Sequence, residues 1–122
     1  MNIWIGAKFP SLNEYINAER RNRFLGAKMK KEWTELVSVV AQREDIPDDG
    51  WMDKEYPIGI KFIVHEQNTR RDIDNVSAMV AKTCLDGLVK AGILPDDSQK
   101  YINKIEFEFV IDKDNPGVEI IL

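Results

Sequence analysis

The sequence predicts an α/β (α+β) fold, in which helices pack against a small mixed β-sheet in the order β-α-α-β-α-β-β. Two patterns indicate this class: short segments alternate apolar and polar residues with the period of a strand, and longer segments repeat apolar residues with the period of a helix. The length of 122 residues suits one hydrophobic core, so we expect a single domain over residues 1–122.

The first strand and helix are expected at the N-terminal end. Residues 3–9 alternate in the manner of a strand and stop at Pro10, because proline is disfavoured inside a sheet. Ser11 is followed three residues later by Glu14, which is the spacing of a capping box. These residues predict a short helix from residue 12 towards residue 18.

A second helix is expected over residues 28–43, because apolar side chains recur there at helical spacing. The basic residues 20–26 lie between the two helices and are expected to form a loop. Residues 46–50 read Ile-Pro-Asp-Asp-Gly, which breaks the second helix and starts an acidic loop. The apolar residues that define the second helix are Trp33, Leu36, Val37 and Val40.

The second half of the chain predicts two strands around a helix, followed by a short final strand. Residues 56–65 and 102–111 alternate as strands do, and residues 75–91 follow the helical period and end at Gly92. A turn sequence precedes residues 118–122, which we expect to form a hairpin with the strand before them. The residues of the 102–111 strand that we expect to face the core are Ile105, Phe107 and Phe109.

The charge of the chain is unevenly distributed. The net charge of −4 argues against general attraction to nucleic acid, yet residues 20–31 hold six basic residues and no acidic one, and residues 45–55 are acidic. One segment can therefore face a polyanion although the whole chain is acidic. The basic residues are Arg20, Arg21, Arg23, Lys28, Lys30 and Lys31.

Composition disfavours several classes of protein. No apolar run is long enough to span a bilayer and no signal segment begins at Met1, so we expect a cytoplasmic protein with no membrane partner. The single cysteine, Cys84, excludes an internal disulfide and fits a reducing compartment. His65 is the only histidine, which gives little support to a histidine-based metal site or triad in one subunit.

Five aspartates surround the helix expected at residues 75–91. Mg²⁺ and Mn²⁺ prefer oxygen ligands, so carboxylates gathered in this way suggest a metal site. The neighbouring Arg70, Arg71 and Lys82 add positive charge, which suits a phosphate substrate. The five acidic residues are Asp72, Asp74, Asp86, Asp96 and Asp97.

The spacing of these residues allows them to converge. Asp72 and Asp74 alternate, so in extended backbone both side chains point the same way. Asn75, Lys82 and Asp86 fall within roughly 40° of one another around a helix. The Asp96-Asp97 pair follows a turn that could fold back towards that face.

Purely structural roles account for the same residues. Aspartate is a preferred N-cap, so one of Asp72 and Asp74 could do no more than cap the helix. Lys82 and Asp86 could form a plain surface ion pair, and Asp96-Asp97 a solvated turn. An EF-hand does not explain the segment, because the glycine and terminal glutamate that its loop requires are missing.

The ordered set of motifs resembles the RusA family of Holliday-junction resolvases, which are small phage- and prophage-associated endonucleases. The family order is R-D-x-D-N, then K-x-x-x-D-G/A-L, a glycine and a D-D pair. A weaker N-terminal pattern of Pro10, Ser11, Asn13 and a basic helix leading to Trp33 also fits. The matching residues are Arg71-Asp72-Ile73-Asp74-Asn75, Lys82-Thr83-Cys84-Leu85-Asp86-Gly87-Leu88, Gly92 and Asp96-Asp97-Ser98-Gln99.

The resemblance implies a role for each matching residue. Asp72, Asp74 and Asp97 would ligate Mg²⁺, with Mn²⁺ as a substitute, and Lys82 would stabilise charge or help to position the attacking water. Asp86, Asp96 and Asn75 would support these ligands, with Asp96 as the alternative to Asp97 in a shifted register. Here Lys82 lies ten residues after Asp72, about four more than in the best-known members, so its position along the helix axis differs.

The resemblance also implies an activity and an assembly. The chain would be a Mg²⁺-dependent endodeoxyribonuclease that resolves four-way DNA junctions by paired symmetric nicks, leaving 5′-phosphate ends, in DNA recombination and repair. Paired nicks favour a C₂ homodimer with one site per subunit. An alternative is a junction-binding protein of a prophage that does not cut, and a third possibility is a structural protein in which the aspartates only cap and solubilise.

Basic residues on two segments are expected to bind the DNA backbone. Arg70 and Arg71 adjoin the acidic site, and a guanidinium suits phosphate oxygens. The cluster at residues 20–31 is expected to hold the arms of the junction by charge rather than by sequence, with a solvated helix entry as the alternative.

Overall fold

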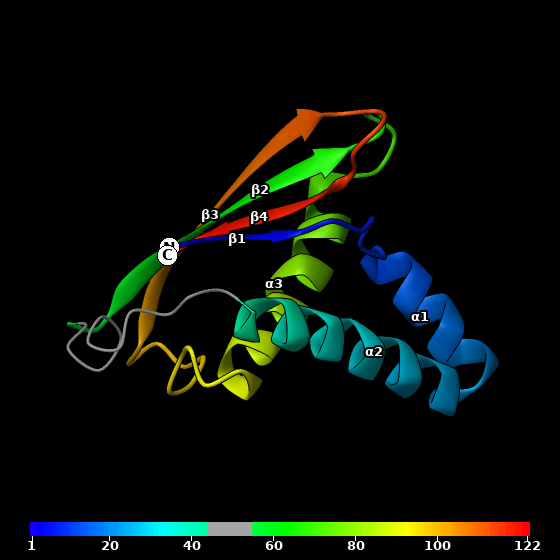
Figure 1. Ribbon diagram of the computed structural model, residues 1–122. Helices are drawn as coiled ribbons and strands as arrows, with labels where there is room; N and C mark the ends of the chain where they lie inside the picture. The colour runs from blue at the N-terminus through cyan, green and yellow to red at the C-terminus, as the bar shows by residue number, and fades with distance from the viewer. Residues whose placement is uncertain (44–54) are drawn as a thin grey trace.

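The computed structural model describes residues 1–43 and 55–122, and within them it places helices and strands in the predicted order (Figure 1). The α+β fold class is therefore confirmed. Trp51 and the acidic loop expected at residues 46–50 lie outside the described residues. The elements are β1 (Asn2–Ile5), α1 (Leu12–Arg21), α2 (Arg23–Gln42), β2 (Ile58–Glu66), α3 (Ile73–Lys90), β3 (Ile102–Ile111) and β4 (Gly117–Ile121).

The four strands form one mixed sheet in the order β1-β4-β2-β3. β2 and β3 run parallel and are joined through α3, whereas β4 runs antiparallel to both β1 and β2. The predicted hairpin between β3 and β4 is therefore wrong. Val118 and Ile120 of β4 are fully buried, and the central position gives them a neighbouring strand on each side.

The core lies between one face of the sheet and the helices, which Figure 1 shows on a single side of it. Alternation along β2 turns Ile60, Phe62 and Val64 towards this side, and all three are buried. Residues at helical spacing on α3 and α2 cover them. The main helical contributors are Val76, Val80, Cys84 and Leu88 from α3 with Val37 and Ala41 from α2.

The connection between α1 and α2 is shorter than predicted. The expected loop at residues 20–26 is wrong, because α1 continues to Arg21 and α2 begins at Arg23. Asn22 alone separates them: its backbone N–H donates to the Ala18 carbonyl, and its side chain accepts from the Phe24 N–H at 2.9 Å. One asparagine thus ends one helix and caps the next, and the arginines beside it are good helix formers.

Two further expectations need adjustment at the ends of the sheet. The first strand ends at Ile5 rather than near residue 9. Ile105 was predicted to face the core. It pairs in register with the buried Ile60, but it is 41% exposed because β3 is an edge strand. Ser11 is the N-cap of α1 as predicted, since its hydroxyl accepts a 3.2 Å hydrogen bond from the Glu14 N–H.

Close packing of α2 against α3 makes Gly87 sensitive to substitution. A Cβ at residue 87 would lie 2.6 Å from the Cβ of Val37 and 3.0 Å from the Thr34 carbonyl oxygen. We expect Gly87→Ala to destabilise the protein by about 2 kcal/mol in urea unfolding, because overpacking outweighs the gain in helix propensity. Gly59→Ala is the control, since its Cβ would meet nothing closer than 3.6 Å, and an equal loss of stability in both variants would contradict this packing.

Candidate functional site

The start of α3 presents two exposed carboxylates, those of Asp72 and Asp74. Asp72 occupies the N-cap position with extended backbone, and its carbonyl accepts the first helical hydrogen bond from Val76 at 3.2 Å. Its side chain, however, makes no capping hydrogen bond. Capping therefore does not account for the Asp72 carboxylate, and both acids remain available beside the positive end of the helix dipole.

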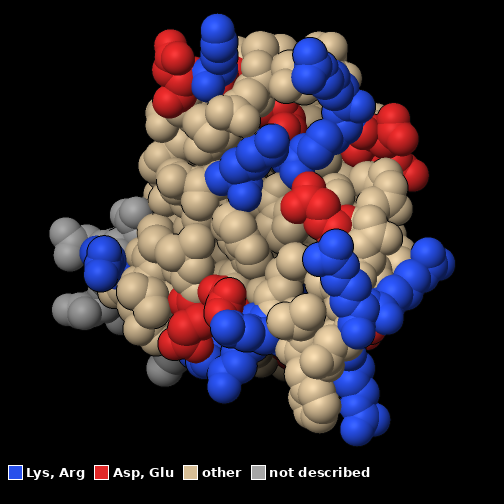
Figure 2. Space-filling view, turned by 90° about the vertical axis from the view of Figure 1, so that its right-hand side faces the viewer, with Lys and Arg blue, Asp and Glu red and all other residues tan. Residues whose placement is uncertain are grey.

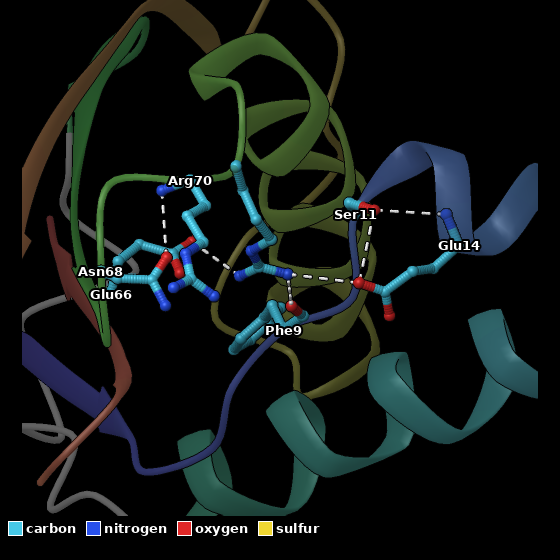
Figure 3. Close-up of polar contacts among 7 residues, drawn as sticks. Phe9, Ser11, Glu14, Glu66, Asn68 and Arg70 are labelled. Atoms are coloured by element: carbon cyan, nitrogen blue, oxygen red, sulfur yellow. Dashed lines mark hydrogen bonds and ion pairs between the residues drawn. The ribbon is translucent and has the colours of Figure 1, made fainter. Parts of the chain in front are cut away.

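A largely buried arginine, Arg71, anchors the loop that leads into α3. Figure 3 labels the residues that it contacts, Phe9, Glu14 and Glu66. The Arg71 guanidinium donates to the Glu66 carboxylate at 2.6 Å and to the Phe9 carbonyl at 2.6 Å, and it lies 3.5 Å from the Glu14 carboxylate. These contacts join the end of β2 to the segment before α1. They hold the next residue, Asp72, in a fixed relation to the sheet.

Arg70 and Arg71 were both expected to bind phosphate, but the structure gives them different surroundings. The Arg71 side chain is only 18% exposed, and its guanidinium is engaged by protein groups, so it is placed as a positioning residue rather than on the surface. Arg70 is exposed, and its backbone N–H donates to the Asn68 side chain at 3.0 Å, which shapes the turn. Arg70 is therefore the arginine that can reach a phosphate from this loop.

Lys82 and Asp86 lie further along α3 and pair with each other. Their charged atoms are 3.4 Å apart, one turn of helix separating the residues. Lys82 is ten residues from Asp72, which corresponds to about 15 Å along the axis, so it is not brought to the Asp72 carboxylate. Asp86 instead lines a shallow pocket together with Lys30 and Lys31 of α2.

Asp96 and Asp97 are exposed and lie beyond the opposite end of α3 (Figure 1). The Leu94 N–H donates to the Leu88 carbonyl, and the Ser98 carbonyl accepts from Ile102 at the start of β3. The segment between them is thereby held at the end of α3 remote from Asp72. The 18 residues of α3 make that helix about 27 Å long.

The structure therefore divides the predicted acidic set. Asp72 and Asp74 share one end of α3, whereas Asp97 is at the other, and ligands of one Mg²⁺ ion must each approach it to about 2.1 Å. Within residues 1–43 and 55–122, no group of three His, Cys, Asp or Glu side chains is arranged to hold a metal ion. The turn before Asp96 does not fold back along the helix.

Two acidic donors are still a set that suits magnesium. Mg²⁺ usually keeps several waters and is held by one or two carboxylates together with substrate phosphates. The exposed pair at the start of α3 has this chemistry, and the uncapped Asp72 supplies an oxygen donor that the helix itself does not use. The residues present therefore fit a divalent cation that is completed by water, substrate or a further acid.

The predicted basic cluster follows the junction of α1 and α2. Arg20 and Arg21 lie in the last turn of α1, where positive charge is favoured, and Arg23 begins α2. The three side chains are exposed, as are Lys28 and Lys31. Figure 2 shows this side of the molecule, where basic side chains are interspersed with acidic ones and do not form one continuous basic patch. Lys30, the remaining member of the cluster, is partly buried.

Sequence reasoning missed Glu66, the buried partner of Arg71. Glu66 is only 6% exposed. The alternation of β2 contains the signal, because residue 66 falls on the same face as Ile60, Phe62 and Val64. An acidic residue at a core-facing position requires a partner, and the arginine five residues later supplies it.

Comparison with known proteins adds an independent line of evidence. Residues 7–122 match the family described as Endodeoxyribonuclease RusA. No curated protein matches the chain. The described helices include none long and apolar enough to cross a membrane. The family match covers essentially all of the chain, including both acidic segments, and on this evidence the chain belongs to the RusA endodeoxyribonuclease family.

Proposed function

We propose that this protein is a divalent-metal-dependent endonuclease that resolves four-way DNA junctions, with Asp72 and Asp74 as ligands of Mg²⁺ or Mn²⁺. The observation that carries the proposal is the exposed carboxylate pair at the start of α3, of which Asp72 is left uncapped. Membership of an endodeoxyribonuclease family supplies the reaction class. Because Asp97 lies beyond the other end of α3, it is proposed as a third ligand supplied by the partner chain of a C₂ homodimer, the assembly that paired nicks favour.

Each residue around the pair has a role in this proposal. A divalent cation lowers the pKa of bound water and neutralises charge on the scissile phosphate. Arg70 binds a phosphate oxygen from the exposed side of the loop, and the Arg71–Glu66 ion pair keeps the loop in place. The half-buried Asn75 supports Asp72 and Asp74 from the first turn of α3.

The supporting roles of the remaining polar residues follow from their positions. Lys82 lies about 15 Å along the α3 axis from Asp72, too far to position the attacking water. It is proposed to contact the DNA backbone instead. Asp86 orients Lys82 through their ion pair. Asp96 adjoins Asp97 and supports it, and it is the ligand in place of Asp97 if the alignment with the family motif shifts by one residue.

The basic cluster at the α1–α2 junction is proposed to hold the arms of the junction. We expect the combined variant Arg20→Gln, Arg21→Gln and Arg23→Gln to weaken junction binding about 10-fold or more at moderate salt. The slope of log affinity against log salt should fall by up to about 2.7, because each lost phosphate contact removes about 0.9. Gel-shift titrations over a salt series in EDTA measure both quantities.

The control for this variant removes a basic residue from the sheet face opposite the helices. Lys61 lies there, paired with Glu108 at 3.1 Å. Lys61→Gln should leave the affinity and its salt slope close to those of the wild type. If it weakens binding as much as the arginine variant does, then the cluster has no special part in holding DNA.

Cleavage of a labelled synthetic four-way junction tests the proposed function. With Mg²⁺ we expect paired nicks in opposite strands, no nicking in EDTA, and little cutting of linear duplexes made from the same strands. Binding of the junction without any nick in either Mg²⁺ or Mn²⁺ would replace the proposal with a junction-binding protein. Neither binding nor nicking would reject both functions.

A further inference from the structure

The turn between α1 and α2 carries two exposed apolar side chains, Phe24 and Leu25, which we call the apolar tip. Phe24 is 68% exposed and Leu25 46%, and Phe24 is the most exposed large apolar side chain of the described residues. Figure 1 shows this turn at the end of the helices that points away from the sheet. Exposure alone does not mark a contact, because single apolar side chains are common on protein surfaces. The charge around the apolar tip is therefore needed to judge its role.

Positive charge surrounds the apolar tip. Arg20 and Arg21 end α1, Arg23 begins α2, and all three are exposed. The Arg23 guanidinium lies 5.2 Å from the centroid of the Phe24 ring, within the range of a cation–π contact. A ligand that suits this surface offers negative charge to the arginines and a flat apolar face to the ring. Nucleic acid has both, in its phosphates and its bases.

The apolar tip is held rigidly. Asn22 is the only residue between the two helices, and its side chain accepts from the Phe24 N–H at 2.9 Å. The helices then approach each other closely, because a Cβ at Gly26 would lie 2.8 Å from the Glu19 Cγ. Phe24 therefore projects from a fixed first turn of α2. An aromatic side chain on such a support loses little conformational entropy on binding, which suits it to a stacking contact.

A groove along α1 links the apolar tip to the acidic pair. Glu14 lines the groove at the start of α1, and its carboxylate is 3.5 Å from the Arg71 guanidinium, next to Asp72. Arg21 and Leu25 line the groove at the other end of the helix. The ten residues of α1 span about 15 Å, the length of about four stacked base pairs at about 3.4 Å each. A DNA strand that enters the proposed metal site can therefore reach the apolar tip within a few nucleotides.

We propose that the apolar tip is a wedge that stacks on a base at the branch point of a four-way junction. This inference rests on the proposed function for the identity of the DNA. The Phe24 ring lies against the base, Leu25 fills the space beside it, and the flanking arginines hold the surrounding phosphates. Apolar side chains insert in this way most readily where base stacking is already interrupted. Strands that change helix at a branch point have interrupted stacking, whereas a linear duplex offers no such base, so the apolar tip favours junctions over duplexes.

A second copy of the chain is the competing occupant of the apolar tip. A two-fold contact through the turn would bring Arg20, Arg21 and Arg23 of one copy beside the same arginines of the other. Like charges placed opposite each other in an interface oppose association. The charge around the apolar tip therefore favours a polyanion. The competing contact predicts a change of oligomeric state when Phe24 is replaced.

Binding of a junction and of a linear duplex in EDTA tests the apolar tip without any cleavage. We expect Phe24→Ala to weaken junction binding about 10-fold, as loss of one base–aromatic contact does, and to change duplex binding less than about twofold. Phe24→Trp keeps an aromatic ring and should bind the junction nearly as well as the wild type, whereas Phe24→Leu should lose most of the affinity. An equal effect of Phe24→Ala on both DNAs, or none on either, would overturn the proposal.

Val39→Ala is the matched control, because it removes a 36% exposed apolar side chain from the same helix. Val39 lies 15 residues after Phe24, about 22 Å along α2. Its replacement should leave junction affinity unchanged, and circular dichroism should show both variants to be folded, since both side chains are exposed. Loss of junction binding by Val39→Ala as large as that of Phe24→Ala would overturn the special role of the apolar tip.

A fluorescent base locates the contact on the DNA. The adenine analogue 2-aminopurine pairs with thymine and is quenched when it stacks on neighbouring bases. With this probe at the branch point, we expect saturating wild-type protein to raise the fluorescence, because the ring displaces a neighbouring base, and saturating Phe24→Ala to raise it much less. A probe in the middle of an arm should not respond. The same rise with Phe24→Ala, or a response only in the arm, would overturn the proposal.

Sedimentation of the free protein tests the competing occupant. We expect Phe24→Ala and the wild type to have the same oligomeric state without DNA. A smaller assembly of Phe24→Ala would assign the apolar tip to an interface between copies and overturn the proposal. Junction binding by the wild type that is unchanged in Phe24→Ala would overturn this inference alone. A wild-type protein that binds no junction would reject the proposed function and this inference together.

Discussion

Asp74→Asn is expected to lower the rate of junction cleavage in Mg²⁺ by about 10³-fold. Asparagine keeps the size of the side chain but removes the negative charge that holds the cation, and loss of about 4 kcal/mol of transition-state stabilisation corresponds to this factor. Asp74 is exposed in the first turn of α3, so folding should be nearly unaffected. Single-turnover cleavage of a labelled junction measures the rate, and Asp72→Asn should behave similarly.

The control for this loss is Asp114→Asn, which makes the same chemical change at an exposed residue between β3 and β4. Its cleavage rate should stay within about twofold of the wild type. Binding of the junction in EDTA should be retained by both variants, since phosphate contacts come from other residues. Wild-type cleavage by Asp74→Asn would contradict the assignment of the metal site.

Glu66→Ala is expected to destabilise the protein by about 3 kcal/mol, the largest effect on folding that the site residues should produce. The substitution leaves the largely buried Arg71 guanidinium without its principal counter-charge, and breaking a buried ion pair in this way typically costs about 3–5 kcal/mol. The low end applies because the Phe9 carbonyl still accepts from Arg71. Urea unfolding followed by circular dichroism measures the change.

An exposed ion pair between β2 and β3 provides the comparison. Glu108→Ala breaks the contact with Lys61. The Lys61 and Glu108 side chains are 39% and 52% exposed, so the loss of stability should be less than about 1 kcal/mol. The double variant Glu66→Leu with Arg71→Met should recover part of the lost stability, because it leaves no buried charge unpaired. Equal effects of Glu66→Ala and Glu108→Ala would show that the Arg71 contact does not anchor the loop.

The sequence predicted the elements whose pattern is local. The alternation of β2 and the helical period of α3 each depend on near neighbours, and both appear within two or three residues of the predicted bounds. Gly92 ends its helix as expected, with φ of 78°, a left-handed conformation that glycine adopts without strain. Strand pairing was not predictable in this way, because β4 pairs with β1 from the other end of the chain.

In the candidate site, too, the features that depend on local spacing were predicted, and those that depend on distant segments were not. The pair Asp72 and Asp74 was placed at the start of the helix from spacing alone, and the structure puts it there. Whether Arg71 faced solvent depended on Phe9 and Glu66, which contact it from other segments. The position of Asp97 depended on the path of the chain after α3, which the hydrogen bond from Leu94 to Leu88 determines.

Paramagnetic broadening by Mn²⁺ tests most directly whether the acidic pair at α3 binds the metal. Amide NMR signals of the wild-type protein, recorded without DNA during a Mn²⁺ titration, should broaden first at residues 72–75, and at residues 96–98 in the same step if the partner completes the site. Asp74→Asn should abolish this selective broadening. Broadening that begins elsewhere, or that is unchanged in Asp74→Asn, would contradict the proposed metal site.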